Sequence, residues 1–211
     1  PHIESLAGYA KVFHQAGASW TLSSYASEGG NFGMFIGNYN HMKTINKRIW
    51  DAARELKVKR VIVGECGHAW RVLYYFSNSL NGPFDFLDSK YRQPTHICEY
   101  TLDLIKRGAL KFDKTANDKF SVTYHDSCNV ARGTRMGETP GDQFTIPREI
   151  IRNVCNKFVD MSEETIGDRT FCCGGGGGTL TDELIELRVK GAMPRMQALK
   201  RVKDSHNVNF F

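Results

Sequence analysis

The stretch KRVIVGECGHA, residues 59–69, decides the fold class of this chain. Basic residues lead into branched apolar ones, and Gly64 and Gly67 then flank a turn that contains Cys66. A short branched run with polar ends is typical of a buried strand in a parallel sheet. We therefore expect a buried strand over residues 59–64, a sharp turn, and a helix over residues 69–76.

Helices and strands alternate along the rest of the chain. The apolar spacing predicts further helices over residues 5–16, 42–56, 95–108, 148–156 and 181–202, a short helix after Cys128, and further strands at 120–124 and 157–161. We expect Thr95 to cap its helix, Gly108 to end it, Pro147 to begin the next and Pro194 to kink or break the last. The alternation predicts an α/β fold with mostly parallel sheets, in which functional groups gather at strand–helix junctions.

The composition limits the classes of function. The chain has 211 residues, 41% of them hydrophobic, and a net charge of +5. This argues against a disordered or collagen-like chain, and no apolar run approaches the roughly 18 residues of a membrane-spanning helix. Basic residues are dispersed along helices, as at 43–60 and 188–203, which favours solvated helix faces over a nucleic-acid-binding stripe. No signal peptide is visible, and a chain that begins at Pro1 and ends at Phe210-Phe211 is expected to be part of a longer one.

Six cysteines carry most of the chemical information. Cys172 and Cys173 are adjacent and are followed by a glycine run, residues 174–178. Glycines permit the tight turn that points two thiolates to one side, and their backbone N–H groups can donate to sulfur, so Gly174 and Gly175 are candidate cofactor-binding residues. Two buried cysteines before a flexible hinge, or a phosphate-binding loop, are the alternatives, although no GK[ST] ending follows the glycines.

The other cysteines differ in local context. Cys128 follows a predicted strand and would begin a helix, where the helix dipole favours a thiolate. Cys66 also follows a strand, with His68 beside it as a proton donor or as an ordinary surface histidine. Cys98 and Cys155 lie in predicted helices beside apolar residues and are expected to be buried and inert.

Metal binding is the expected role of Cys128, Cys172 and Cys173. Structural zinc sites usually show paired C-x-x-C knuckles, and this sequence contains none. Iron with several sulfurs therefore fits the spacing better than a single tetrahedral zinc ion. His125, three residues before Cys128, is expected to form local hydrogen bonds.

The two halves of the chain form a weak internal repeat with an offset of about 148 residues. In this alignment Ser23-Ser24 falls on Cys172-Cys173, and residues 61–63 fall on 208–210. We expect a degenerate first half, residues 1–113, and a second half, residues 114–211. The position equivalent to Cys66 falls just beyond Phe211, where a further cysteine-bearing turn is expected.

These motifs resemble the CCG-domain (cysteine-rich) family found in heterodisulfide reductase catalytic subunits. The family pattern is a cysteine after a strand, a distant Cys-Cys-Gly and then a C-x-x-C; HDSC (residues 125–128) and FCCG (residues 171–174) match its first two parts. The motifs GECGHA (residues 64–69) and HDSCN (residues 125–129) are most similar to those of DsrK-type subunits of Dsr MKJOP complexes.

The resemblance implies two pseudo-repeated CCG-type halves and a noncubane [4Fe-4S] cluster held by five cysteines. Cys128, Cys172 and Cys173 would be ligands, and the missing C-x-x-C would supply two more. Cys66 would be an additional ligand or a substrate-handling thiol, with His68 beside it in a catalytic role. The first half, with serines at the cysteine pair, would hold no cluster.

The resemblance also implies a function. The chain would reduce or oxidise a disulfide or trisulfide of a small DsrC-like protein in dissimilatory sulfur metabolism, with membrane subunits of the Dsr MKJOP type as partners. It would lie at the cytoplasmic face of the inner membrane through those subunits, without binding nucleic acid or spanning the membrane itself. Three alternatives stay open: a heterodisulfide reductase acting on small thiols, an electron-transfer subunit of a glycolate, lactate or glycerol-phosphate dehydrogenase, and a zinc-binding interaction domain.

Overall fold

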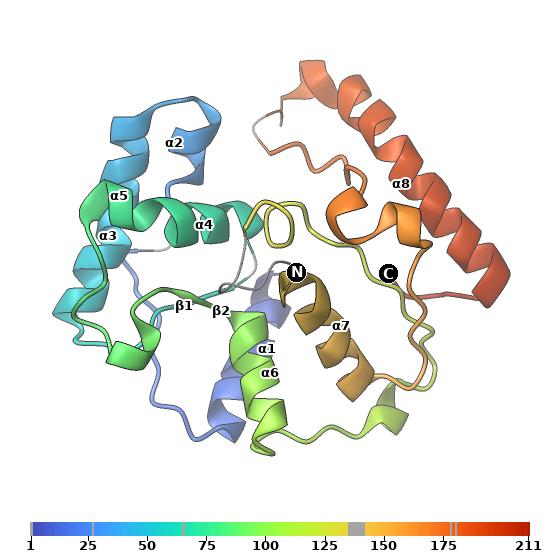
Figure 1. Cartoon of the computed structure of the whole chain (residues 1–211), viewed down its shortest axis with the longest axis horizontal. Coiled ribbons are helices and arrows are strands. Elements are labelled where there is room, and N and C mark those ends of the chain that lie inside the picture. Colours follow the sequence, from blue (N-terminus) through green and yellow to red (C-terminus); the bar gives the residue numbers. More distant parts are fainter. Residues whose placement is uncertain (1, 27, 65, 135–141, 178, 180) are drawn as a thin grey trace. The chain divides into compact units, whose positions relative to one another are not determined.

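The computed structural model describes every residue except 1, 27, 65, 135–141, 178 and 180 (Figure 1). Glu65 and Gly178, which belong to the two predicted cysteine turns, therefore lie outside the described residues. The chain forms two compact units, unit 1 (Pro1–Phe112) and unit 2 (Asp113–Phe211).

Unit 1 is mostly helical, with one short parallel pair of strands. Its elements are α1 (His2–Gln15), α2 (Asn31–Phe35), α3 (Tyr39–Glu55), β1 (Ile62–Val63), α4 (Gly67–Arg71), α5 (Ser77–Asn81), β2 (Thr95–His96) and α6 (Ile97–Lys106). A π-helical turn, Val72–Phe76, joins α4 to α5, so the helix predicted over residues 69–76 is part of a longer helical segment.

The strand predicted at residues 59–64 is shorter and less buried than expected. Only Ile62 and Val63 pair, in parallel with Thr95 and His96, and both are half-buried. The prediction that Thr95 caps a helix is wrong, because its N–H donates to the Val61 carbonyl at 2.9 Å as part of this pairing. α6 begins after His96 instead.

His96 caps α6 through a reciprocal pair of hydrogen bonds. Its Nδ1 accepts from the Cys98 N–H at 3.3 Å, and the Glu99 carboxylate accepts from the His96 N–H at 2.8 Å. Such a capping box satisfies backbone donors that the first turn leaves open. The apolar residues of α6 then pack against Phe13 of α1, which lies beside it (Figure 1).

Unit 2 contains two long helices and several single turns. The helices are α7 (Asp142–Val154) and α8 (Ile185–His206), and the 3₁₀ turns are Lys114–Asn117, Glu163–Thr165, Gly167–Arg169 and Asp182–Leu184. Pro147 lies inside α7 rather than at its start, so that prediction is wrong. α8 continues through Pro194, so the helix does not break there, and the kink stays a prediction.

Parallel pairing in unit 2 centres on Val122, which forms parallel bridges to both Phe158 and Phe210. In place of the strands predicted at residues 120–124 and 157–161, the structure has only these single-residue bridges. One side of α8 packs Ala198 and Val202 into the core of this unit. Mixed helices with short parallel pairings are consistent with the α/β class, whereas the pseudo-repeat stays a prediction.

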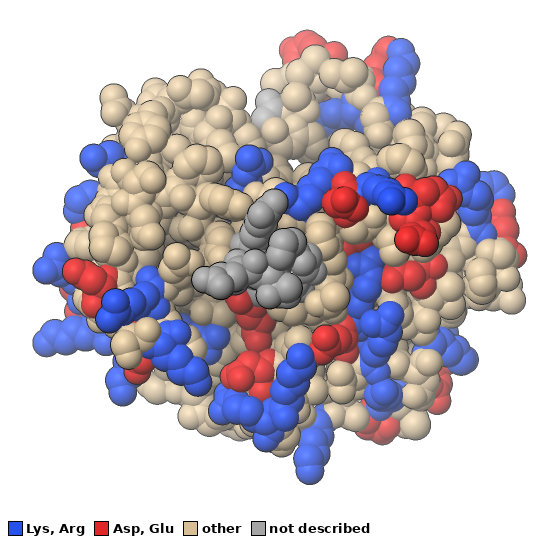
Figure 2. All heavy atoms as spheres, viewed as in Figure 1, with Lys and Arg blue, Asp and Glu red and all other residues tan. Residues whose placement is uncertain are grey.

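The surface charges are of mixed sign. On the face shown in Figure 2, basic and acidic side chains are interspersed. Lys47 pairs with Asp51 at 2.5 Å and Lys200 with Asp204 at 2.6 Å, one helical turn apart. In the part of the chain that the structure describes, no helix is long and apolar enough to cross a bilayer.

Candidate metal centre

Two carboxylates lie just past the ends of neighbouring parallel segments in unit 2. Asp126 follows the segment of Val122, and Asp160 follows the segment of Phe158. Both accept hydrogen bonds from Arg148 of α7. Nη1 and Nη2 donate to the two oxygens of Asp126 at 2.6 and 2.8 Å, and Nε and Nη2 donate to those of Asp160 at 2.5 and 3.0 Å.

These three residues form a clamp: Asp126 is fully buried, the Arg148 side chain is only 8% exposed, and Asp160 is partly exposed. Burial alone would lower the pKa of Arg148, but hydrogen bonds and charge from the two aspartates outweigh it and raise this pKa. Removing one partner from such a network leaves a buried charge and costs about 3–5 kcal/mol. The clamp therefore fixes the backbone two residues before Cys128.

Cys128 begins a turn rather than the short helix that the sequence predicted. The Gly133 N–H donates to the Cys128 carbonyl at 2.7 Å, and the described residues up to Thr134 form turns. The helix-dipole argument for a Cys128 thiolate is therefore not supported. The Asn129 Nδ2 donates to the Cys128 sulfur at 3.3 Å instead, and the thiol is free and exposed.

Cys172 and Cys173 lie in a glycine turn packed against α8. The N–H groups of Gly174 and Gly175 donate to Sγ of Cys172 and Cys173, each at 3.3 Å. Both thiols are exposed. Gly174 has a φ of +76°, and a Cβ at this position would lie 2.9 Å from the Ala192 Cβ, so the turn requires glycine there.

The two cysteine segments are joined at their bases. The buried hydroxyl of Thr170 donates to the Asp126 carbonyl at 3.0 Å, and the Gly167 N–H donates to an Asp126 carboxylate oxygen at 2.8 Å. Cys172 lies two residues after Thr170, and Cys128 lies two residues after Asp126. Two residues of fully extended chain span at most about 7 Å, so each cysteine is close to the Thr170–Asp126 hydrogen bond. Unit 2 thus brings together segments that are more than 40 residues apart in the sequence.

The donor set of unit 2 fits an iron–sulfur group. Such clusters are held by cysteine thiolates and are influenced by hydrogen bonds to sulfur. Cys128, Cys172 and Cys173 are exposed free thiols, and each sulfur accepts one N–H. Among the described residues, no three His, Cys, Asp or Glu side chains are grouped closely enough to bind one metal ion directly. A cluster places iron and sulfide between its thiolates, so its ligands are spaced more widely than those of a single ion.

Unit 1 places Cys66 and His68 at the start of α4. Cys66 is the N-cap residue, and its exposed sulfur accepts from the Ala69 N–H at 3.4 Å. His68 packs edge-on against the Phe35 ring, with centroids 4.8 Å apart. Partial burial, and secondarily the charge of Arg71, lower the pKa of His68, so its ring favours the neutral form.

The remaining two cysteines are less accessible. Cys98 is half-buried against the core between α1 and α6, and burial, with the charge of Glu99, raises its pKa to about 11. Cys155 is half-buried just after α7, and burial raises its pKa as well. A raised pKa disfavours the reactive thiolate, in line with the expectation that these two thiols are inert.

His125 has a distant partner rather than the local one expected. Its Nδ1 lies 3.4 Å from the Thr170 hydroxyl, 45 positions away in the sequence. Burial, then the positive charge of Arg195, lower the pKa of His125 to about 4, so the ring is neutral near pH 7. His125 thus belongs to the contact that joins the two cysteine segments.

Sequence reasoning missed the charged groups that support these segments. The charge pattern predicts solvated basic residues along the helices, but Arg148 is 7% exposed and Arg195 is 2% exposed. Helical spacing could have predicted that Arg195 is buried. Ala198 and Val202 lie three and seven positions after it, so all three residues share one face of α8, and all three are buried.

Comparison with known proteins assigns the region that contains these cysteines to a family. Residues 122–207 match the family described as a cysteine-rich domain, CCG. That range begins at the central parallel segment and includes Cys128, Cys172 and Cys173. The class that fold and site define is thus the CCG cysteine-rich domain.

The relatives narrow this class. The chain is 40% identical to "Hdr-like menaquinol oxidoreductase iron-sulfur subunit 2" of Archaeoglobus fulgidus, over 99% of this chain and 42% of that protein. It is 29% identical to a subunit of the dihydromethanophenazine:CoB–CoM heterodisulfide reductase of Methanosarcina acetivorans, over 80% of this chain and 38% of that protein. An "EtfAB:quinone oxidoreductase" of Syntrophomonas wolfei is 25% identical over 69% of this chain and 18% of its own length.

The chain belongs to the CCG heterodisulfide-reductase-like family. It spans 42% of the length of the Archaeoglobus fulgidus relative. Its relatives include iron–sulfur subunits of oxidoreductases. No solved structure matches the chain significantly.

Proposed function

We propose that unit 2 binds a noncubane [4Fe-4S] cluster through Cys128, Cys172 and Cys173, and that the chain transfers electrons in a heterodisulfide-reductase-like complex. One observation carries this proposal. Three exposed free thiols, each accepting an N–H hydrogen bond, lie on two segments joined by the Thr170–Asp126 hydrogen bond. The resemblance to the CCG family implies two further thiolates from a C-x-x-C motif, which the 211 residues do not contain.

The reaction that we propose is reversible reduction of a disulfide by an electron carrier. A disulfide RSSR′ takes up two electrons and two protons to give RSH and R′SH, and the reverse reaction releases them. A bound cluster supplies or accepts these electrons one at a time. The chain's own contribution is to hold the thiolates, donate N–H hydrogen bonds to sulfur and keep the supporting charges away from water.

The partners that we propose are a small DsrC-like protein carrying the disulfide or trisulfide and membrane subunits of the Dsr MKJOP type. The relatives' names support a path between quinol and disulfide, since one is named for menaquinol and another for a heterodisulfide. Cys66, an exposed thiol at the start of α4, is proposed as a substrate-handling thiol or an additional ligand, with His68 as its neighbour.

A second candidate is an electron-transferring subunit without disulfide chemistry. The relative named EtfAB:quinone oxidoreductase favours it, although the identity is only 25%. A disulfide substrate added to the reduced complex separates the two candidates, because only the first predicts rapid reoxidation by the disulfide.

The test uses the full-length protein, purified without oxygen. Wild type should contain iron and acid-labile sulfide and give an EPR signal, and Cys128→Ser should lose most of the iron and that signal while its circular dichroism is unchanged. Cys155→Ser, a half-buried thiol of the same unit outside both cysteine turns, is the matched control and should keep both.

Two outcomes would contradict the proposal: zinc without sulfide in the wild-type protein, or an unchanged signal in Cys128→Ser. Cys66→Ser extends the series. An unchanged signal with slowed disulfide turnover identifies a substrate-handling thiol, whereas an altered signal identifies a ligand.

A further inference from the structure

Arg195 of α8 is a buried guanidinium with only neutral hydrogen-bond partners among the described residues. Its Nη2 donates to the Thr165 carbonyl at 2.9 Å and to the Thr170 hydroxyl at 2.5 Å, and its Nη1 donates to the Met161 sulfur at 3.0 Å. Its Nε has no partner in the described part of the chain. The residue is 2% exposed, so bulk solvent does not reach this nitrogen.

A second buried arginine in the same unit shows how unusual this arrangement is. Arg148 forms ion pairs with both Asp126 and Asp160. Arg195 forms no ion pair within the described ranges, although burying an unpaired charge is costly. Burial lowers the pKa of Arg195, and the negative charges that oppose this effect are those of Asp126 and Cys173. Asp126 already forms its ion pair with Arg148, so Arg195 has no ion-pair partner of its own among the described residues.

The contacts of Arg195 lead to both cysteine segments. Thr170, which accepts from Nη2, lies two residues before Cys172 and also donates to the carbonyl of Asp126, two residues before Cys128. The guanidinium lies over the ring of Phe171, the residue directly before Cys172, at 5.8 Å from the ring centroid. Arg195 thus contacts the base of the Cys172 turn directly and reaches that of the Cys128 turn through Thr170.

We infer that Arg195 is the counter-charge of the cluster, a positioning residue that raises the reduction potential of the group held by Cys128, Cys172 and Cys173. This inference rests on the proposed function of unit 2. Reduction adds a negative charge, and a fixed positive charge in a poorly solvated environment stabilises the reduced form more than the oxidised form. Its hydrogen bond to Thr170 also keeps the two cysteine segments joined.

The test is an EPR-monitored redox titration of the full-length protein carrying Arg195→Met or Arg195→Lys. Arg195→Met removes the charge and should make the midpoint potential more negative. We expect at least a tenfold change in the oxidised-to-reduced ratio at a fixed potential, which is about 59 mV for one electron. Arg195→Lys keeps the charge and should restore most of the shift.

Two further variants keep the test decisive. Lys190→Met removes one charge from the same helix, where the side chain is 79% exposed, and should leave the potential unchanged because solvent and salt screen it. If circular dichroism shows that Arg195→Met does not fold, Arg195→Gln is the second neutral variant.

The outcomes separate this inference from the function on which it rests. Iron loss in the neutral variant with retention in Arg195→Lys supports a role for the charge, whereas iron loss in both indicates a purely structural residue and overturns the inference. A neutral variant with normal iron content and an unmoved potential overturns it as well, and leaves the proposed function intact. Wild-type protein without iron and sulfide overturns both.

Discussion

Two turns in different units have similar local hydrogen bonding, but the acceptor is a serine oxygen in one and a cysteine sulfur in the other. In unit 1 the Ser23 hydroxyl accepts from the N–H groups of Tyr25 at 3.2 Å and Ala26 at 3.0 Å. In unit 2 the sulfurs of Cys172 and Cys173 each accept from the N–H two residues on, at 3.3 Å. A hydroxyl can therefore close such a turn as well as a thiol can, and the turn alone does not require sulfur.

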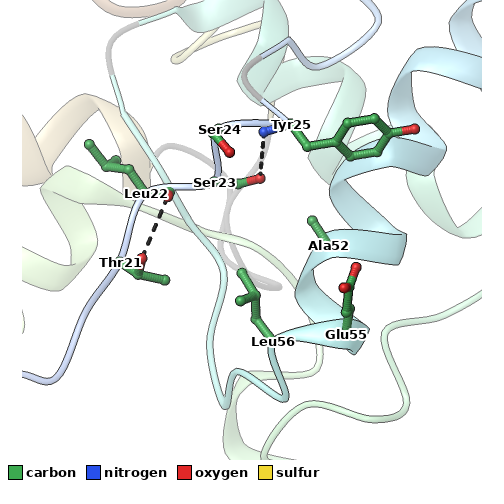
Figure 3. Close-up of a pocket in the computed structure, with 8 residues that line it drawn as sticks. All are labelled: Thr21, Leu22, Ser23, Ser24, Tyr25, Ala52, Glu55 and Leu56. Carbon is green, nitrogen blue, oxygen red and sulfur yellow. Dashed lines mark hydrogen bonds between the residues drawn. The ribbon is translucent and has the colours of Figure 1, made fainter.

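The surroundings of the two turns differ more than the turns themselves. The serine turn borders a pocket of about 260 Å³ beside the end of α3, where Ala52, Glu55 and Leu56 line it (Figure 3). The cysteine turn is tied to α8, because the Arg188 Nε donates to the Gly174 carbonyl at 3.0 Å. The cysteine turn thus differs from the serine turn in its charged contact to a helix, and not in its N–H donors.

The strongest way to test this comparison is to give the cysteine turn the chemistry of the serine turn. The double variant Cys172→Ser/Cys173→Ser should lose essentially all cluster iron, because hydroxyls are poor substitutes for thiolates as iron ligands. Its free energy of unfolding without metal should change by no more than about 1 kcal/mol, since the hydroxyls can accept the same N–H bonds. Iron analysis and urea denaturation measure the two effects.

A double variant that keeps its iron would contradict the proposed ligands. A variant that loses several kcal/mol of stability without metal would instead show that the thiols support the fold, and the similarity of the two turns would then be superficial.

The turn at Cys172-Cys173 could be predicted from its glycines, whereas the helix predicted after Cys128 is a series of turns, and the charged groups that support both segments could not be predicted. Glycines after Cys172-Cys173 and a branched segment before Cys128 are local features of the sequence. Arg148 and Arg195 are buried only because side chains and backbone from distant parts of the chain approach them, among them Asp126, Asp160 and Thr170. Helical spacing places Arg195 on the same face of α8 as Ala198 and Val202 but does not identify these distant partners, and the charge pattern predicts both arginines to be solvated.

The strands show the same limit. The branched residues before Gly64 predict an extended, buried strand, yet only two residues pair because β2 offers only Thr95 and His96. The length of a parallel pairing is limited by the shorter of the two segments that pair. For the same reason α6 is capped one residue later than predicted, since Thr95 is still occupied by the pairing.

A smaller effect is expected from the glycine that ties the cysteine turn to α8. Gly174→Ala should destabilise unit 2 by about 1–2 kcal/mol, because its φ of +76° is unfavourable for a residue with a Cβ. That Cβ would also lie 2.9 Å from the Ala192 Cβ, so the turn must move and the iron content should fall. Urea denaturation and iron analysis test both expectations.

Gly191→Ala is the matched control for that variant. Gly191 lies within α8, and a Cβ there would have no neighbour within 4 Å among the described atoms. Alanine should therefore stabilise the helix by up to about 1 kcal/mol and leave iron unchanged. If both glycine variants behaved alike, the contact between Gly174 and α8 would not be what positions the cysteines.

The smallest effect is expected in the serine turn itself. Ser23→Ala removes the acceptor for the N–H groups of Tyr25 and Ala26, which should cost about 0.5–1.5 kcal/mol because water can partly replace it at this half-buried loop. Ser24→Ala, at the exposed neighbouring position, should stay within about 0.5 kcal/mol of wild type. Neither change should alter the iron content or the EPR signal, because the first unit is expected to bind no cluster. A loss of iron in Ser23→Ala would mean that the serine turn takes part in metal binding, and the contrast between the two turns would no longer hold.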